Sequence, residues 1–77
     1  MPTLFTIFGL RFYFYSDEHL PIHVHIRNSD GRAKIQVEPE VVLIENNGIK
    51  PNDIKKALFL VRLYKKQITE SWYEYFR

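Results

Sequence analysis

The sequence predicts an α+β domain in which an antiparallel sheet of four to five strands packs against one long C-terminal helix. Residues 22–27 and 32–37 alternate apolar and polar side chains on either side of a glycine-containing turn, which is typical of a half-buried hairpin. Residues 51–76 contain no internal glycine or proline, and their apolar residues recur at steps of three and four, which predicts an amphipathic helix. Because 77 residues suffice for one domain at most, we expect a single domain over residues 1–77, with its strands within residues 3–44.

The N-terminal residues predict a first hairpin. Residues 4–8 and 10–15 are rich in residues that favour strands, and Gly9 between them indicates a tight turn. Since successive strand side chains point to opposite faces, Phe12 and Phe14 share one face of the second strand. The other face of that strand carries Arg11, Tyr13 and Tyr15.

A polar loop and a second hairpin follow. Residues 16–21 end in proline, which lacks a backbone donor, so we expect a loop that leads into the strand at 22–27. The turn at residues 28–31 then leads into the strand at 32–37. If Arg27 pairs with Arg32, the polar residues of both strands lie on the same outward face. His25 is then opposite Lys34, and His23 is opposite Gln36.

The C-terminal half predicts a short last strand and the helix. We expect a strand at residues 41–44, a turn at Asn46–Gly48, and a helix over about residues 51–76 with Pro51 in its first turn. The first half of this helix is apolar nearly all round, which a one-sided sheet cannot cover. We therefore expect an interface with a second copy in a homodimer, or with a small partner protein, through Phe59, Leu60 and Leu63.

Composition restricts the classes of protein to consider. The chain has no cysteine, so it has no disulfide, and this fits a reducing compartment. The first ten residues lack the pattern of a signal peptide, and no segment approaches the roughly 20 apolar residues of a membrane span. We expect a cytoplasmic protein with no membrane association. Its net charge is +2, with the positive charge concentrated in residues 51–77, which permits an anionic partner.

All three histidines fall within residues 19–25, and they are the best indication of function. His23 and His25 alternate on a strand, a spacing that offers two imidazoles to one metal ion. His19 is the candidate third ligand, and Glu38 or Asp17 would add a carboxylate. Such a site would bind a divalent metal such as zinc, manganese or iron, and a bound hydroxide would attack a phosphodiester.

Two metal-free roles are also open to the histidines. In the first they are ordinary polar residues of the strand face, with His19 hydrogen-bonded to carbonyls or to Glu18. In the second, His23 and His25 act as catalytic acid and base, or as contacts to an anion.

The outward face of the sheet also combines aromatic rings and cations, as a platform for single-stranded nucleic acid does. Its residues are Tyr13, Tyr15, His23, His25, Arg27, Arg32 and Lys34. Ordinary cross-strand pairs have the same composition, so this pattern alone does not distinguish a binding face from a solvated one.

Three motifs resemble a known bacterial family. They are Gly-x-Arg-Phe-x-Phe-Tyr at residues 9–15, Ser-x-Glu-His-x-Pro-x-His-Val-His at residues 16–25, and Trp-x-Glu-x-Phe at residues 72–76. Together they are similar to the family described as domain of unknown function 4160. Two positions depart from its pattern: Leu20 stands where an acidic residue is common, and Gln36 where an aromatic one is common.

The resemblance implies a small α+β domain, often encoded beside a second small protein, with a suspected role in toxin–antitoxin modules. It implies no established activity. We therefore expect an interaction module that binds a partner protein or a nucleic acid in a toxin–antitoxin-like pair. The alternative is a small metal- or histidine-dependent hydrolase, most plausibly a ribonuclease, in which Arg32 or Lys34 would stabilise phosphate charge.

Overall fold

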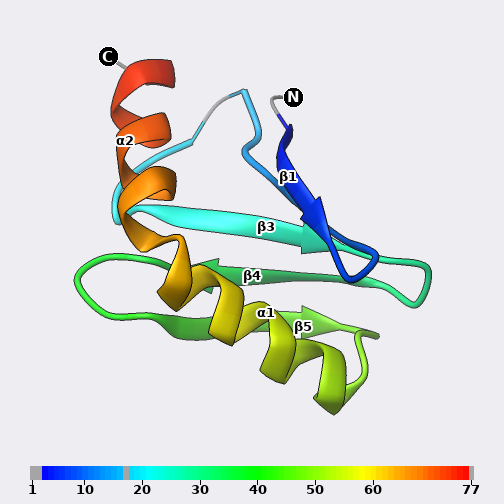
Figure 1. Ribbon diagram of the computed structural model, residues 1–77. Coiled ribbons are helices and arrows are strands. Elements are labelled where there is room, and N and C mark those ends of the chain that lie inside the picture. Colours follow the sequence, from blue (N-terminus) through cyan, green and yellow to red (C-terminus); the bar gives the residue numbers. More distant parts are fainter. Residues whose placement is uncertain (1–2, 17, 77) are drawn as a thin grey trace.

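The computed structural model, which describes residues 3–16 and 18–76, is an α+β fold with one sheet and two helices (Figure 1). The sheet is an antiparallel meander with the strand order β1-β2-β3-β4-β5, and both helices follow it in the chain. The strands are β1 (Thr3–Ile7), β2 (Leu10–Tyr13), β3 (His23–Arg27), β4 (Arg32–Gln36) and β5 (Val42–Asn47). The helices are α1 (Pro51–Leu63), which crosses the sheet near β4 and β5 in Figure 1, and α2 (Lys65–Tyr75).

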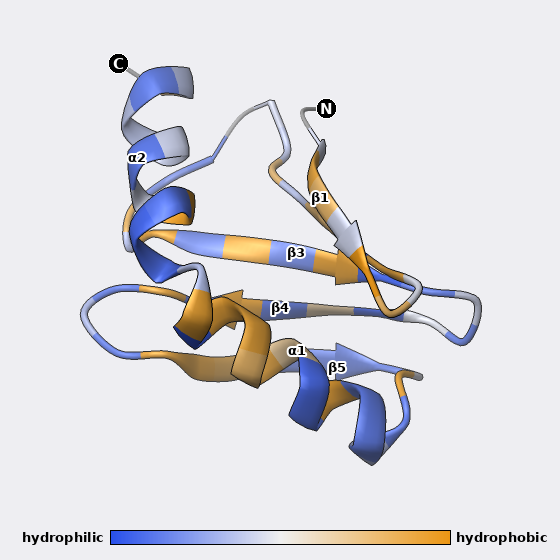
Figure 2. Cartoon of the chain, viewed as in Figure 1, coloured by the Kyte–Doolittle hydropathy of each residue, from blue (hydrophilic) through white to orange (hydrophobic). Residues whose placement is uncertain are grey.

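The predicted register of the second hairpin is confirmed. Arg27 pairs with Arg32, His25 with Lys34, and His23 with Gln36. The hydropathy alternates visibly along β3 (Figure 2): Val24 and Ile26 belong to the hydrophobic core, and polar residues alternate with them. The first hairpin is confirmed as well: its turn holds Phe8 and Gly9, both at positive φ, as a tight turn between twisted strands requires.

The core lies between the sheet and the helices. Its largest fully buried side chains include Phe12 and Phe14 of the N-terminal region and Ile68 of α2. Trp72, near the end of α2, packs edge-on against Phe14 with ring centroids 5.3 Å apart. The end of the second helix thus closes the core at the end of the sheet where the chain leaves β2.

The prediction of one long helix is wrong, because the helical segment is interrupted at Tyr64. That residue has φ −102° and ψ 18°, and it caps α1 through its N–H and the carbonyl of Leu60. No glycine or proline marks the position. The ring of Tyr64 packs against Phe5 of β1 with centroids 5.1 Å apart, so the break coincides with a contact that is distant in sequence.

The last strand is longer than the predicted one at residues 41–44, since β5 continues to Asn47. The side chain of Asn46 both accepts from the N–H of Ile49 and donates to its carbonyl, which places the turn after the strand. The backbone then passes so close to the preceding turn that a Cβ on Gly31 would clash with the carbonyl oxygen of Asn47. Only glycine fits at this crossing without moving the backbone.

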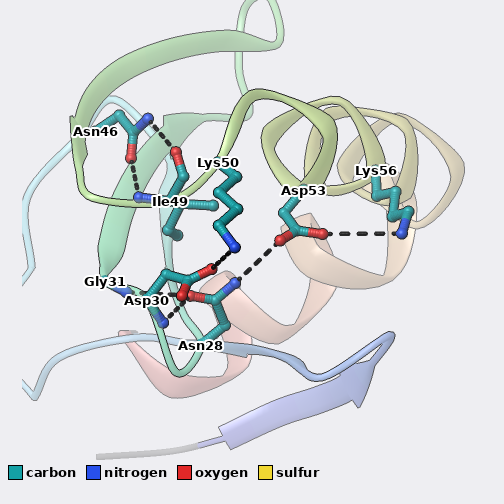
Figure 3. A network of polar contacts seen from close by, with 8 residues as sticks. All are labelled: Asn28, Asp30, Gly31, Asn46, Ile49, Lys50, Asp53 and Lys56. Carbon is teal, nitrogen blue, oxygen red and sulfur yellow. Dashed lines mark hydrogen bonds and ion pairs between the residues drawn. The ribbon is translucent and has the colours of Figure 1, made fainter.

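A network of polar contacts connects the β3–β4 turn to the start of α1 (Figure 3); we call it the turn network, and its members are Asn28, Asp30, Gly31, Asn46, Ile49, Lys50, Asp53 and Lys56. The Asn28 carboxamide oxygen accepts from the N–H groups of Asp30 and Gly31 at 2.9 and 3.1 Å. Its amide group faces Asp53 at 3.5 Å, and Lys50 lies 3.8 Å from Asp30. These contacts fix how the helix leaves the sheet.

Among the described residues, no helix has the length and apolar character needed to cross a membrane.

Candidate functional site

Two histidines of β3 lie at the centre of a buried polar cluster. His23 and His25 are on the predicted polar face of the strand, yet only 6% and 9% of their surfaces are exposed. The two histidines therefore lie on the predicted face of the strand, but the expectation that solvent reaches them there is wrong. Aromatic rings cover them: Tyr15 lies over His25 with centroids 4.0 Å apart, and Trp72 lies 5.4 Å from His23.

The carboxylate of Glu18 joins the two imidazoles. Its Oε1 lies 2.9 Å from Nε2 of His23, and its Oε2 lies 2.9 Å from Nε2 of His25. Oε2 also accepts a hydrogen bond from the backbone N–H of Tyr15 at 3.0 Å. We call Glu18, His23 and His25 the Glu18 cluster. Their ligand atoms all lie within 4.8 Å of one another, so they could hold a metal ion.

The hydrogen bonds constrain the protonation of His23. Its Nδ1 lies 2.9 Å from the carbonyl oxygen of Pro21, which can only accept, so Nδ1 carries a hydrogen. The Nε2 that faces Glu18 then has two options. It carries a second proton, which makes His23 an imidazolium paired with the carboxylate, or it presents a lone pair toward the centre of the cluster.

His25 makes a less complete contact. Its Nε2 is within 2.9 Å of Glu18, but the direction of the contact does not satisfy hydrogen-bond geometry. We therefore describe it as a close contact between the imidazole and the carboxylate rather than as a hydrogen bond. Within the described parts of the chain this nitrogen is buried with no hydrogen-bond partner. A buried polar atom in this state calls for a physical cause.

The electrostatics of the cluster favour a charged carboxylate beside a neutral His25. Burial lowers the pKa of His25 and is the largest effect, Glu18 raises it through its charge and its close polar contact, and His23 and Lys34 lower it. Burial raises the pKa of the Glu18 carboxyl, but the N–H of Tyr15 and the two imidazoles together lower it by more. Its pKa therefore lies below the usual value.

A polar cavity of about 400 Å³ opens beside the cluster on the same side of the sheet. His25 belongs to both, because its ring lines the cavity while its Nε2 faces Glu18. The cavity is lined by Tyr13, Tyr15, His25, Arg32, Ala33, Lys34, Glu45 and Asn47. Burial raises the pKa of Tyr13, and Tyr15 adds to this effect, whereas Arg27 and Arg32 oppose it. The Tyr13 hydroxyl is thus protonated at neutral pH.

Three arginines stand side by side across this sheet face. Arg11 of β2 pairs with Arg27 of β3, which pairs with Arg32 of β4; we call them the arginine row. Arg11 donates to the hydroxyl of Thr3 and lies over the ring of Tyr13. Over residues 3–16 and 18–76, no ion pair connects any of the three to a carboxylate.

The predicted third ligands do not join the cluster. His19 is exposed and lies outside the group of close ligand atoms, and Glu38 pairs with Lys65 at 3.5 Å instead. Asp17 lies outside the described residues. The sequence suggested Glu18 only as a partner for His19. Glu18 lies five and seven residues before the two histidines, and this spacing was the available signal. It indicates a contact only when the path of the intervening loop is known.

The other predicted site residues divide by exposure. Arg27 and Arg32 are exposed and Lys34 is half-buried, whereas Tyr13 is buried, with only 2% of its surface exposed. Leu60 is a correction to the predicted partner interface, because only 3% of it is exposed and the protein's own core covers it. Phe59 and Leu63 are each 58% exposed and stay candidates for a contact with another chain.

Comparison with known proteins gives a family and no relative of known function. Neither the curated proteins nor the solved structures contain a match to this chain. A family model does match, over residues 9–73, which includes the Glu18 cluster, the arginine row and most of α2. The chain belongs to the family described as domain of unknown function (DUF4160).

Proposed function

We propose that this protein is a small interaction module that binds single-stranded nucleic acid on the sheet face that carries the arginine row. The row is the observation that carries the proposal. Three like charges directly opposite one another on neighbouring strands destabilise a sheet. A polyanion bound across the strands would remove this repulsion, because arginine pairs with phosphate through parallel N–H donors.

The cavity beside the row supplies the remaining requirements of such a site. Its volume of about 400 Å³ is within the range of small-ligand sites, roughly 300–1,000 Å³. Tyr15 is 38% exposed and offers a ring on which a base can stack, whereas Tyr13 is buried and its ring lies 5.7 Å from that of Tyr15. Lys34 and Arg32 line the wall next to this ring, so cations and an aromatic plane occur together.

The biological setting rests on other grounds. The resemblance to this family suggests a toxin–antitoxin-like pair, and a module that binds nucleic acid suits such a pair. A cytoplasmic location is part of the proposal and is supported by the absence of cysteine.

Binding is better supported than the hydrolase alternative. In a ribonuclease, His23 and His25 would act as acid and base and would need to reach the substrate. Here both Nε2 atoms face the Glu18 carboxylate, and that of His25 is buried. The arginine row, in contrast, includes two exposed members, Arg27 and Arg32.

A salt titration tests the proposal. A short fluorescein-labelled single-stranded RNA would be titrated with the protein by anisotropy over a range of salt concentrations. We expect affinity to fall with salt, and Arg27→Gln and Arg32→Gln each to reduce the slope of log K against log salt by about 0.7. Arg62→Gln, an exposed arginine of α1, is the matched control and should leave the slope unchanged. Equal losses in all three variants, or no binding by the wild type, would refute the proposal.

A second candidate function, contact with another copy of this chain, is favoured by the edge of the sheet. All six residues of β5 are exposed, including Val42, Leu43 and Ile44, and among the described strands it pairs with β4 alone. An antiparallel pairing of two β5 strands is self-complementary, as a two-fold dimer requires. Light scattering should give a dimer that Ile44→Lys converts to a monomer, and a monomeric wild type at high concentration would exclude this contact.

A further inference from the structure

We infer that the Glu18 cluster is a structural zinc site that ties the loop residues 18–21 to β3. The inference is independent of nucleic-acid binding and rests on the geometry of the three side chains. Two imidazole nitrogens and one carboxylate are a donor set that suits zinc, whereas magnesium and calcium prefer oxygen ligands throughout. The chain has no cysteine, so a disulfide cannot supply this tie.

The ligand atoms are nearly in position. Zinc binds imidazole nitrogen at roughly 2.0–2.1 Å and carboxylate oxygen at about the same distance, so tetrahedral ligands lie about 3.3–3.4 Å apart. The Glu18 oxygens lie 2.9 Å from Nε2 of His23 and of His25. Each contact uses a different carboxylate oxygen, and the three ligand atoms lie within 4.8 Å of one another, so side-chain rotations would have to adjust these distances when zinc binds.

The hydrogen bond of His23 to Pro21 is the second argument. Imidazoles that bind a metal commonly donate their other N–H to a backbone carbonyl or a carboxylate, which fixes the tautomer and the ring orientation. The Pro21 carbonyl holds Nδ1 of His23 in this way and directs Nε2 into the cluster. The carbonyl belongs to the same loop as Glu18, so the loop both supplies a ligand and orients another.

The state of His25 is the third argument. Within the described residues its Nε2 is buried and has no aligned hydrogen bond, although Oε2 of Glu18 lies within 2.9 Å. A metal ion bound between this imidazole and the carboxylate would give the nitrogen the partner that it lacks.

The surroundings assign a structural rather than a catalytic role. At most 11% of any of the three side chains is exposed, and the rings of Tyr15 and Trp72 cover the histidines. A water molecule would complete the coordination, and only a small part of each ligand side chain is exposed to a substrate. The metal would therefore stabilise the fold, as structural zinc does in other small domains.

The first test needs no variant. The protein would be freed of metal with a chelator and titrated with zinc, and long-range ¹H–¹⁵N spectra would report each imidazole nitrogen. We expect one zinc per chain, with shifts at Nε2 of His23 and His25 and none at His19. If His23 carries protons on both nitrogens and no shift follows zinc addition, the cluster is an ion pair and the inference is wrong.

The second test compares two variants. Glu18→Gln keeps the shape of the side chain and removes the charge, and His19→Ala removes an exposed histidine of the same loop. Zinc at 100 times its dissociation constant should raise Tm of the wild type and of His19→Ala by roughly 10 °C or more. Glu18→Gln should lose most of this shift. Equal shifts in Glu18→Gln and the wild type, or a loss in His19→Ala, would overturn the assignment, and the spectra decide the case if Glu18→Gln does not fold.

Discussion

The turn network and the Glu18 cluster are both built from polar side chains around one centre, but they satisfy those side chains differently. Asn28, at the centre of the turn network, bonds mainly to backbone N–H groups two and three residues away. Glu18 instead contacts two histidine side chains on a strand, and one of them has a buried nitrogen without an aligned partner. The first arrangement completes a turn, whereas the second leaves a buried nitrogen for which a bound metal ion would supply the partner.

The largest expected effect comes from removing the wall of the Glu18 cluster. Trp72→Ala should lower the free energy of unfolding by about 3–5 kcal/mol, because it empties a buried volume against Phe14 and His23. Urea denaturation measures the loss. Tyr73→Ala, at a neighbouring position that is 61% exposed, is the control and should change stability by no more than about 0.5 kcal/mol. A similar loss in both variants would show that Trp72 has no special place in the core.

The turn network is broken most directly at its backbone crossing. Gly31→Ala should cost about 3 kcal/mol, at the upper end of overpacking penalties, because the new Cβ would clash with the Asn47 carbonyl oxygen. Gly9→Ala meets no atom within 4 Å, although its φ is +72°, so its cost should be only about 1–2 kcal/mol. Thermal unfolding of the two variants compares a clash with a conformational strain, and equal losses would contradict the clash.

Removing the centre of each cluster sharpens the comparison. Glu18→Ala should cost about 2 kcal/mol in metal-free protein, since it removes hydrogen bonds to a charged group and leaves buried imidazoles unpaired. The measurement is urea denaturation in the presence of a chelator. A loss below about 0.5 kcal/mol would mean that the cluster contributes nothing to the metal-free fold.

The corresponding change in the turn network should have a smaller effect. Asn28→Ala removes acceptors from two N–H groups near the surface, and water can replace them, so we expect a loss of about 1 kcal/mol by the same measurement. The burial of the two centres, rather than their number of contacts, accounts for the difference. A larger loss for Asn28→Ala than for Glu18→Ala would reverse this interpretation.

The sequence predicted what depends on local pattern. The alternation at residues 22–27 and 32–37 excludes a one-residue slip, which would turn an apolar face outward, and the pairing of Arg27 with Arg32 chosen from the turn is observed. The start of α1 at Pro51 follows equally from local chemistry. The burial of Leu60 did not, because a helix that is apolar nearly all round does not reveal which residues face its own sheet.

What the sequence could not predict depends on contacts that are distant along the chain. The interruption at Tyr64 coincides with packing on Phe5, and no residue near it breaks helices. The role of Glu18 depends on how a loop folds over the sheet, which alternation does not describe. His19 was the natural candidate ligand because its side chain is an imidazole. The loop instead places the neighbouring carboxylate of Glu18 beside His23 and His25.

His25 belongs to two regions at once, with Nε2 in the Glu18 cluster and its ring in the wall of the cavity. A ligand that fixes this ring from one side changes the free energy of binding on the other, and thermodynamic reciprocity makes the two changes equal. If zinc strengthened oligonucleotide binding about tenfold, the oligonucleotide would strengthen zinc binding by the same factor. If both ligands bind as proposed, this one imidazole would couple metal binding to the occupancy of the sheet face.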